Sequence, residues 1–142
     1  MGMGHGGDMQ KMKTTKLIAV CDVNPRRLDE AKAKFSCKAY ADYDAMLKDP
    51  DLEAVFIATP SGTHSDFALK AARAGKHLVI EKPMDVSYAR CREVLEACQK
   101  AKVRACVNFN IRFTDQAIQI RNAIADGLLG KLVLGEARLK WF

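Results

Sequence analysis

A lysine between an acid and a proline, Glu81-Lys82-Pro83, directly follows the apolar run 78–80. Such a run is typical of a buried strand, and open α/β sheets bind their ligands at the carboxyl ends of strands. An ammonium group there can stabilise a developing alkoxide, and partial desolvation would lower its pKa toward a range useful for acid–base catalysis. Lys82 is therefore the candidate catalytic residue. The alternative is a lysine that leaves a strand end with its charge in water.

A second apolar run, 54–57, ends in a polar turn that contains Thr59, Pro60 and His64 and then opens a helical pattern. Two strands that each end in a polar turn with a proline predict one wall of a crevice for a nucleotide and a substrate. The alternative for His64 is a helix-start residue without a chemical role.

Three glycines near the start, Gly2, Gly4 and Gly7, have the spacing of the dinucleotide-binding loop G-x-G-x-x-G. That loop normally joins a strand to a helix, but a single residue precedes these glycines and the helix after them would run only over 8–13. Two readings stay open. The glycines form the phosphate loop of a fold whose first strand is missing, or residues 1–7 are an unrelated leader.

An acid, Asp22, ends the apolar run 17–21. A carboxylate at that place accepts hydrogen bonds from the adenosine ribose and disfavours a 2′-phosphate, which favours NAD as the cofactor. Arg26 and Arg27 follow closely and could bind a 2′-phosphate, so NADP stays possible. The alternative for both arginines is an exposed first turn of a helix.

The elements that would position these residues follow from the alternation of short apolar runs with helical periodicity. This alternation is typical of β–α–β units and a parallel sheet, so the predicted fold class is α/β, a doubly wound, Rossmann-like sheet without its first strand. We expect strands at 17–21, 38–40, 53–58, 76–80, 104–107 and 132–141, and helices at 25–35, 43–47, 64–74, 88–101 and 115–125.

The missing first strand would leave a gap between strands 17–21 and 53–58. Unpaired backbone groups at such edges are costly when they are buried. We therefore expect these strands to pair directly, to take up a strand from another copy, or to leave the chain marginally stable.

Composition limits the function classes. The chain has 142 residues, 49% of them hydrophobic, and a formal net charge of +6. The basic residues are spread among acidic ones without an aromatic platform, which argues against nucleic acid. No apolar run approaches the roughly 18 residues of a membrane span. Five cysteines without a C-x-x-C pair predict free thiols in the cytoplasm and no metal site.

Five segments carry a resemblance to a known family. Together they closely resemble the nucleotide-binding half of the glucose–fructose oxidoreductase/inositol dehydrogenase/MocA family, and the likeness covers about residues 16–142. In chain order they are Asp22, ATPSGTH at 58–64, AGKH at 74–77, EKPM at 81–84 and NFNIRF at 108–113.

The resemblance implies an oxidoreductase that transfers a hydride between nicotinamide and a secondary alcohol of a sugar, inositol or similar polyol. Residues 1–127 would be its domain for NAD or NADP, with 1–15 irregular or a remnant of the phosphate loop. Residues 128–142 would begin a second α/β domain, which completes the substrate site and makes a homo-oligomer contact.

The resemblance also implies roles for the polar turns. The lysine that matches Lys82 lies beside the nicotinamide and contacts the reacting hydroxyl. Glu81 would orient this lysine or the ribose, and Pro83 would fix the turn. Asn110 and Arg112 match a segment near the substrate.

The turn at Thr59, Pro60 and His64 matches one that runs along the pyrophosphate and the nicotinamide ribose of the cofactor. The usual general base of the family is a histidine of the second domain, often four residues after an aspartate, and no D-x-x-x-H occurs here. We therefore expect this chain alone to be inactive. The alternative is a non-catalytic, truncated remnant that binds nucleotide or oligomerises.

Overall fold

The computed structural model describes residues 2–138. The contacts within the chain define two compact units that divide after Asn108. No helix among the described residues is long and apolar enough to cross a membrane.

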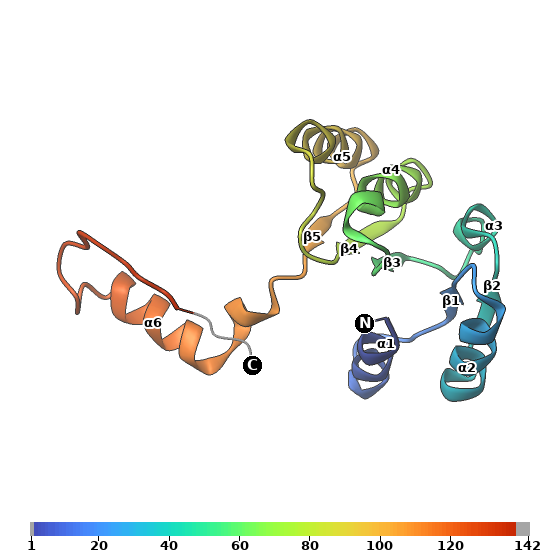
Figure 1. Cartoon of the computed structure of the whole chain (residues 1–142), viewed down its shortest axis with the longest axis horizontal. Helices are drawn as coiled ribbons and strands as arrows, with labels where there is room; N and C mark the ends of the chain where they lie inside the picture. Colours follow the sequence, from blue (N-terminus) through green and yellow to red (C-terminus); the bar gives the residue numbers. More distant parts are fainter. Residues whose placement is uncertain (1, 139–142) are drawn as a thin grey trace. The chain divides into compact units, whose positions relative to one another are not determined.

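The first unit alternates helices and strands along the chain (Figure 1). This order confirms the expected α/β class. The elements are α1 Gly2–Lys11, β1 Ala19–Cys21, α2 Pro25–Phe35, β2 Lys38–Tyr40, α3 Tyr43–Leu47, β3 Ala54–Ile57, the 3₁₀ turn η1 Ser61–Thr63, α4 His64–Arg73, β4 His77–Ile80, α5 Tyr88–Ala101 and β5 Ala105–Val107.

All strand pairs in the first unit are parallel. β1 pairs with β2, and a second sheet has the order β3-β4-β5. Parallel strands joined by helices make a Rossmann-like arrangement, and their carboxyl ends lie on the same edge of each sheet. The fold therefore brings the turns after β3 and β4 together, as the sequence predicts.

Local sequence signals set the helix ends. The side chain of Asn24 accepts hydrogen bonds from the N–H groups of Arg26 and Arg27 at 3.0 and 3.4 Å, and Pro25 occupies the first helical position of α2. Such N-caps satisfy donors that a helix leaves unpaired. Gly75 follows α4 with φ of +73°, the left-handed conformation that favours glycine at a helix end.

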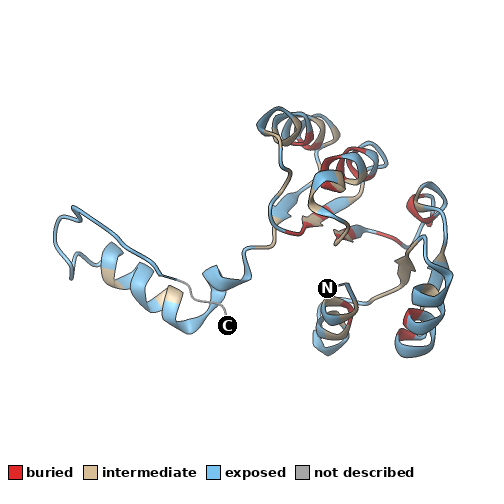
Figure 2. Cartoon of the chain, in the orientation of Figure 1, coloured by how far each residue is buried: buried red, intermediate tan, exposed pale blue. Residues whose placement is uncertain are grey.

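The core of the first unit lies between β3, β4 and the helices α4 and α5. Ile57 and Ile80 are 2% and 1% exposed, and Val94 of α5 is completely buried. Buried segments of α4 and α5 face each other in Figure 2. Because small alanines line the buried side of α4, this helix can approach the sheet and α5 closely.

The glycine-rich start is already helical, whereas the sequence predicted a helix only over 8–13. The binding of phosphate by these glycines stays a prediction. α1 begins at Gly2, so Gly2, Gly4 and Gly7 lie within the helix. Glycine is a poor helix former, which is why the local pattern argued against a helix. Packing overrides that preference. Gly6 is buried where a Cβ would lie 2.8 Å from Cζ of Phe35, so the missing side chain lets α1 pack against α2.

Direct pairing of strands 17–21 and 53–58, one of the three outcomes expected at the gap, does not occur in the part of the chain that the structure describes. Among the described residues β1 bonds only to β2, and β3 bonds only to β4. β1 stays in place because Ala19 and Cys21 pack against the common core and α3 contacts both β1 and β2. Side-chain packing thus holds this strand without a hydrogen-bond ladder to β3.

The second unit consists of the 3₁₀ turn η2 Asn110–Phe113, helix α6 Asp115–Ala125 and an irregular segment. Thr114 caps α6 by accepting from the N–H of Ala117 at 3.3 Å, and the helix has the bounds that the sequence predicted. The structure groups α6 with this unit, whereas the sequence analysis placed it before residue 127. That domain boundary stays a prediction.

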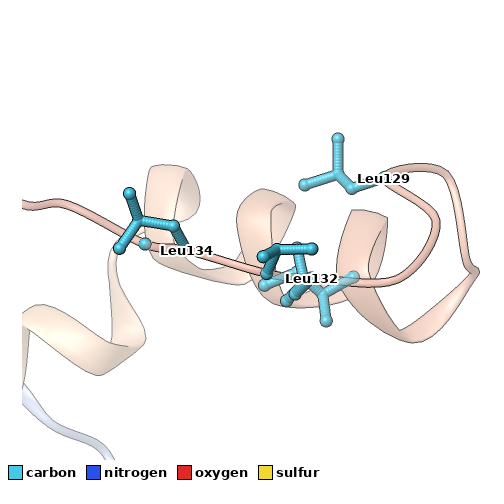
Figure 3. Close-up of a pocket in the computed structure, with 6 residues that line it drawn as sticks. Leu129, Leu132 and Leu134 are labelled. Atoms are coloured by element: carbon cyan, nitrogen blue, oxygen red, sulfur yellow. The ribbon is translucent and has the colours of Figure 1, made fainter.

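The strand expected at 132–141 does not form up to residue 138, and 139–141 lie outside the described residues. Val133 and Leu134 are 90% and 87% exposed, and an extended segment needs a neighbouring strand to become part of a sheet. The segment instead borders an open apolar cavity of about 370 Å³ beside α6 (Figure 3). Its lining residues are Ile124, Leu129, Leu132, Val133, Leu134 and Gly135.

The helical state of the glycines can be tested with two alanine substitutions. Gly6→Ala should lower the melting temperature, because overpacking against Phe35, itself 5% exposed, costs about 1–3 kcal/mol. Gly7→Ala should raise it, because nothing lies within 4 Å of an added Cβ and alanine gains about 0.5–1 kcal/mol in a helix. Thermal unfolding by circular dichroism measures both. A destabilising Gly7→Ala would contradict the helix and return this segment to a loop.

Candidate functional site

A buried carboxylate connects three elements at the carboxyl ends of the strands. Glu81, directly after β4, is 4% exposed. Its Oε1 accepts a hydrogen bond from Nδ2 of Asn108, after β5, at 2.7 Å, and its Oε2 accepts from the N–H of Lys82 at 3.0 Å. Nε2 of His5, from α1, lies 2.8 Å from Oε1. Every polar atom of this carboxylate is therefore satisfied within the site.

The partners of Glu81 also set its charge. Burial by itself raises the pKa of a carboxyl group, but the bonds from Asn108 and the Lys82 N–H, together with the nearby charges of His5 and Lys82, outweigh it. The pKa of Glu81 is therefore lower than that of an ordinary glutamate. A buried negative charge stands beside the base of the candidate catalytic lysine.

His5 is fixed by two contacts. Besides its contact with Glu81, its ring stacks on the ring of Phe56 in β3, with centroids 4.5 Å apart and an angle of 30° between the planes. A Cβ on Gly2 would lie 4.0 Å from Cβ of Ala58, the residue after β3. The start of α1 therefore lies against the carboxyl ends of β3 and β4.

The sequence analysis missed His5 and Asn108 as parts of this site. Two weak signals were present. His5 is the one titratable side chain within the glycine motif, and Asn108 opens the segment NFNIRF. Neither signal identifies Glu81 as the shared partner, because the three residues are far apart in the sequence.

His64 joins the two polar turns that the sequence analysis singled out. The ring is 1% exposed, with Nδ1 2.8 Å from the carbonyl oxygen of Pro83 and Nε2 2.8 Å from that of Thr59. A neutral imidazole can donate to one of these carbonyls, and a doubly protonated ring can donate to both. The turn after β3 and the turn after β4 are thus held together by one buried side chain.

The turn after Lys82 continues to a second carboxylate, Asp85, which the sequence analysis did not select. Asp85 accepts from the N–H of Ser65 at 3.3 Å and from the N–H of Ser87 at 3.0 Å. The nearness of Ser65, together with the bonds from the N–H groups of Ser65 and Ser87, keeps the pKa of Asp85 below the usual value despite burial. This acid connects the starts of α4 and α5 and so supports the Lys82 turn.

The side chain of Lys82 is exposed, while its backbone N–H is bonded to Glu81. Pro83 follows through a cis peptide bond. A flexible ammonium group therefore extends from a turn whose backbone is held by the Glu81 carboxylate and by the contact of Pro83 with His64. A ligand at this edge of the sheet can meet the ammonium without displacing a buried partner.

Asp22 lies directly after β1, and its side chain is 33% exposed. It accepts from the N–H of Asn24 at 2.9 Å, and Nη1 of Arg27 lies 3.8 Å from its second oxygen. Arg26 instead bonds Glu30, one turn along α2, at 3.1 Å. Of the two arginines, Arg27 is the one directed toward the Asp22 carboxylate.

Asn110 and Arg112 lie in η2 of the second unit, and both are exposed. Their place near a substrate stays a prediction. Among the described residues no group of three or more histidine, cysteine, aspartate or glutamate side chains could hold a metal ion.

Comparisons with a family model and with known proteins indicate the same family of oxidoreductases. The model of an oxidoreductase family with an NAD-binding Rossmann fold matches residues 1–109. The chain is 32% identical over 132 residues to the myo-inositol 2-dehydrogenase of Thermotoga maritima, and the match covers 92% of this chain and 40% of that protein.

Solved structures of dehydrogenases are also similar to this chain. The WlbA dehydrogenase from Bordetella pertussis, in complex with NADH and UDP-GlcNAcA, is similar with a TM-score of 0.84 and 31% identity, over 89% of this chain and 38% of that one. The scyllo-inositol dehydrogenase from Lactobacillus casei, with bound NAD(H) and scyllo-inositol, has a TM-score of 0.84 and 29% identity over the same shares. The chain spans about two fifths of the length of these proteins.

The connection made by His64 can be tested through stability. His64→Ala should lower the free energy of unfolding by about 2–4 kcal/mol, because the carbonyls of Thr59 and Pro83 lose their contacts with the buried ring and a cavity remains. His77→Ala is the matched control. His77 is exposed and accepts one bond, from the N–H of Arg104, so its loss should cost at most about 1 kcal/mol. Urea denaturation measures both, and equal effects would contradict the structural role of His64.

Proposed function

Because the chain belongs to the oxidoreductase family with an NAD-binding Rossmann fold, that of glucose–fructose oxidoreductase, inositol dehydrogenase and MocA, we propose that it acts as the nucleotide-binding half of a dehydrogenase. The domain itself is the family's NAD-binding domain. The whole protein would transfer a hydride between nicotinamide and a secondary alcohol of a sugar, inositol or similar polyol. Its relatives include inositol dehydrogenases, which supports this substrate class.

The observation that carries the proposal is the convergence of three groups at one sheet edge. The exposed ammonium of Lys82, the start of α1 and the turn at Thr59 all lie at the carboxyl ends of β3 and β4. A helix start offers N–H groups to a pyrophosphate, and a strand-end turn offers polar groups to a ribose. The arrangement fits an extended dinucleotide better than a small anion alone.

The residues present suit NAD. The first N–H groups of α1, at Gly2 and Gly4, would hold the pyrophosphate, since glycines allow close approach of a ligand to the backbone. Asp22 would accept from the adenosine ribose, and the turn at Thr59, Pro60 and His64 would border the nicotinamide ribose. Bound nicotinamide would supply the hydride acceptor.

Lys82 would then act on the reacting hydroxyl. Its ammonium can hydrogen-bond the substrate oxygen and stabilise the alkoxide that forms when a general base of the whole protein takes the hydroxyl proton; the carbinol carbon would then give up its hydride to the nicotinamide and become a carbonyl carbon. Glu81 holds the Lys82 backbone, and the bond of Pro83 with His64 fixes the next residue. These contacts fix the backbone of Lys82, while its flexible side chain adjusts to the ligand.

NAD is the preferred form of the cofactor in this proposal, with NADP possible. A 2′-phosphate would meet the Asp22 carboxylate, and Arg26 is engaged with Glu30. Arg27, near Asp22, is the arginine that could accommodate a phosphate.

We also propose that the protein is a homo-oligomer in the cytoplasm. The exposed apolar side chains of the second unit support the homo-oligomer, and the five free cysteines support the cytoplasmic location.

Asp22→Ala tests the cofactor assignment. The unmodified chain should bind NADH more tightly than NADPH, and the substitution should reduce this preference about tenfold, since the repulsion of the 2′-phosphate is removed. Asp29→Ala, an exposed acid on α2, should leave the preference unchanged. Fluorescence titration measures the six dissociation constants of the three proteins for NADH and NADPH. Equal affinities for NADH and NADPH in the unmodified chain would remove the role of Asp22.

Lys82→Met tests the reaction. We would join this chain to the part of the Thermotoga maritima relative that follows the matched region, and assay NADH formation with NAD and myo-inositol. Lys82→Met should lower kcat about 10²- to 10⁴-fold, as loss of an acid–base group does. Lys100→Met, an exposed lysine on α5, should leave kcat unchanged. A chimera that keeps its kcat after loss of Lys82 would overturn the catalytic assignment.

A further inference from the structure

The first helix is attached to the site by a small number of contacts. Gly6 packs against Phe35 on the side of α2, and toward the strands His5 contacts Glu81 and stacks on Phe56. Among these contacts the one between His5 and Glu81 joins α1 to the turn that carries Lys82.

We propose that His5 and Glu81 are positioning residues that fix the start of α1 relative to Lys82. This inference rests on the proposed function, in which the start of α1 holds the pyrophosphate and Lys82 stands at the nicotinamide end. The pair would then set the distance between the parts of the protein that hold the pyrophosphate and the nicotinamide of the bound dinucleotide.

The geometry suits this role better than a general contribution to stability. Oε1 of Glu81 receives both His5 and Asn108, and Oε2 receives the N–H of Lys82. One rigid carboxylate thus bonds the helix through one oxygen and the lysine backbone through the other. Stacking on Phe56 fixes the plane of the His5 ring, so its Nε2 is directed at the carboxylate.

The rest of the fold does not depend on this pair. The main core lies between β3, β4, α4 and α5, and its buried residues do not include His5. After removal of His5, Glu81 keeps the bonds from Asn108 and Lys82. We therefore expect His5→Ala to remain folded, with α1 less firmly held.

The test compares NADH, which would reach from the start of α1 to the Lys82 turn, with AMP, which lacks the nicotinamide half. His5→Ala should weaken NADH binding about tenfold or more and AMP binding less than about threefold, because AMP does not reach the Lys82 turn. His5→Gln keeps a donor that can bond Glu81, and it should restore most of the NADH affinity. Lys11→Ala, an exposed position on the same helix, is the control and should change neither affinity.

A double-mutant cycle assigns the effect to the pair. His5→Ala combined with Glu81→Gln should weaken NADH binding no more than the stronger of the two single substitutions, because both remove the same connection. Additive losses would show that the residues act independently and would overturn the proposal. Equal weakening of NADH and AMP by His5→Ala would also overturn it, since that result describes a loosened fold.

Amide hydrogen exchange without ligand separates this inference from the proposed function. His5→Ala should accelerate exchange in α1 at least about tenfold and leave α4 and α5 unchanged. If the unmodified chain binds neither NADH nor AMP, the proposed function fails, and exchange alone decides whether His5 holds α1. Unchanged protection of α1 in His5→Ala would overturn the positioning role in either case.

Discussion

Burial of one carboxylate determines how the elements around the candidate site meet. A charged glutamate at 4% exposure is costly unless hydrogen bonds and nearby positive charge replace the lost water. Glu81 obtains these from His5, Lys82 and Asn108, which belong to α1, to the turn after β4 and to the end of β5. Since a missing partner would leave a buried charge incompletely satisfied, the requirement for bonds becomes a geometric constraint. It holds a helix start, a lysine backbone and a strand end at fixed positions relative to one another.

His64 also fixes backbone positions from a buried site, but here the side chain can donate hydrogen bonds, whereas Glu81 accepts them. Its buried ring contacts the carbonyls of Thr59 and Pro83, so one side chain holds the backbone of both turns. Lys82 remains exposed between the buried Glu81 and Pro83, whose carbonyl contacts His64. The site therefore combines rigid backbone, fixed by buried polar side chains, with one mobile charged group. Such a combination suits a group that must follow a reacting oxygen while the cofactor stays in place.

Local patterns predicted most of the first unit, because its strands and helices are determined by short-range signals. Apolar runs marked β3 and β4, Asn24-Pro25 marked the start of α2, and Gly75 marked the end of α4. The failures share a physical cause, which is that tertiary contacts decided the outcome. Helix α1 depends on packing against α2, and a strand after residue 132 depends on a neighbour that no local pattern supplies. For the same reason the sequence indicated Lys82 and His64 but gave no sign that His5 meets Glu81.

The separation of the two sheets has a consequence for how the site holds together. Ligand contacts proposed for Asp22 come from the end of β1, while Lys82 follows β4, and no ladder of backbone hydrogen bonds joins β1 to β3 among the described residues. The relative position of these two ends therefore depends on side-chain packing, through Ala19 and Cys21 against the core, and on α1, which contacts α2 on one side and Phe56 and Glu81 on the other. A dinucleotide that reached from Asp22 to Lys82 would itself connect the two sheets. Its binding free energy would then stabilise the folded chain as well, because a ligand that binds only the folded state shifts the unfolding equilibrium.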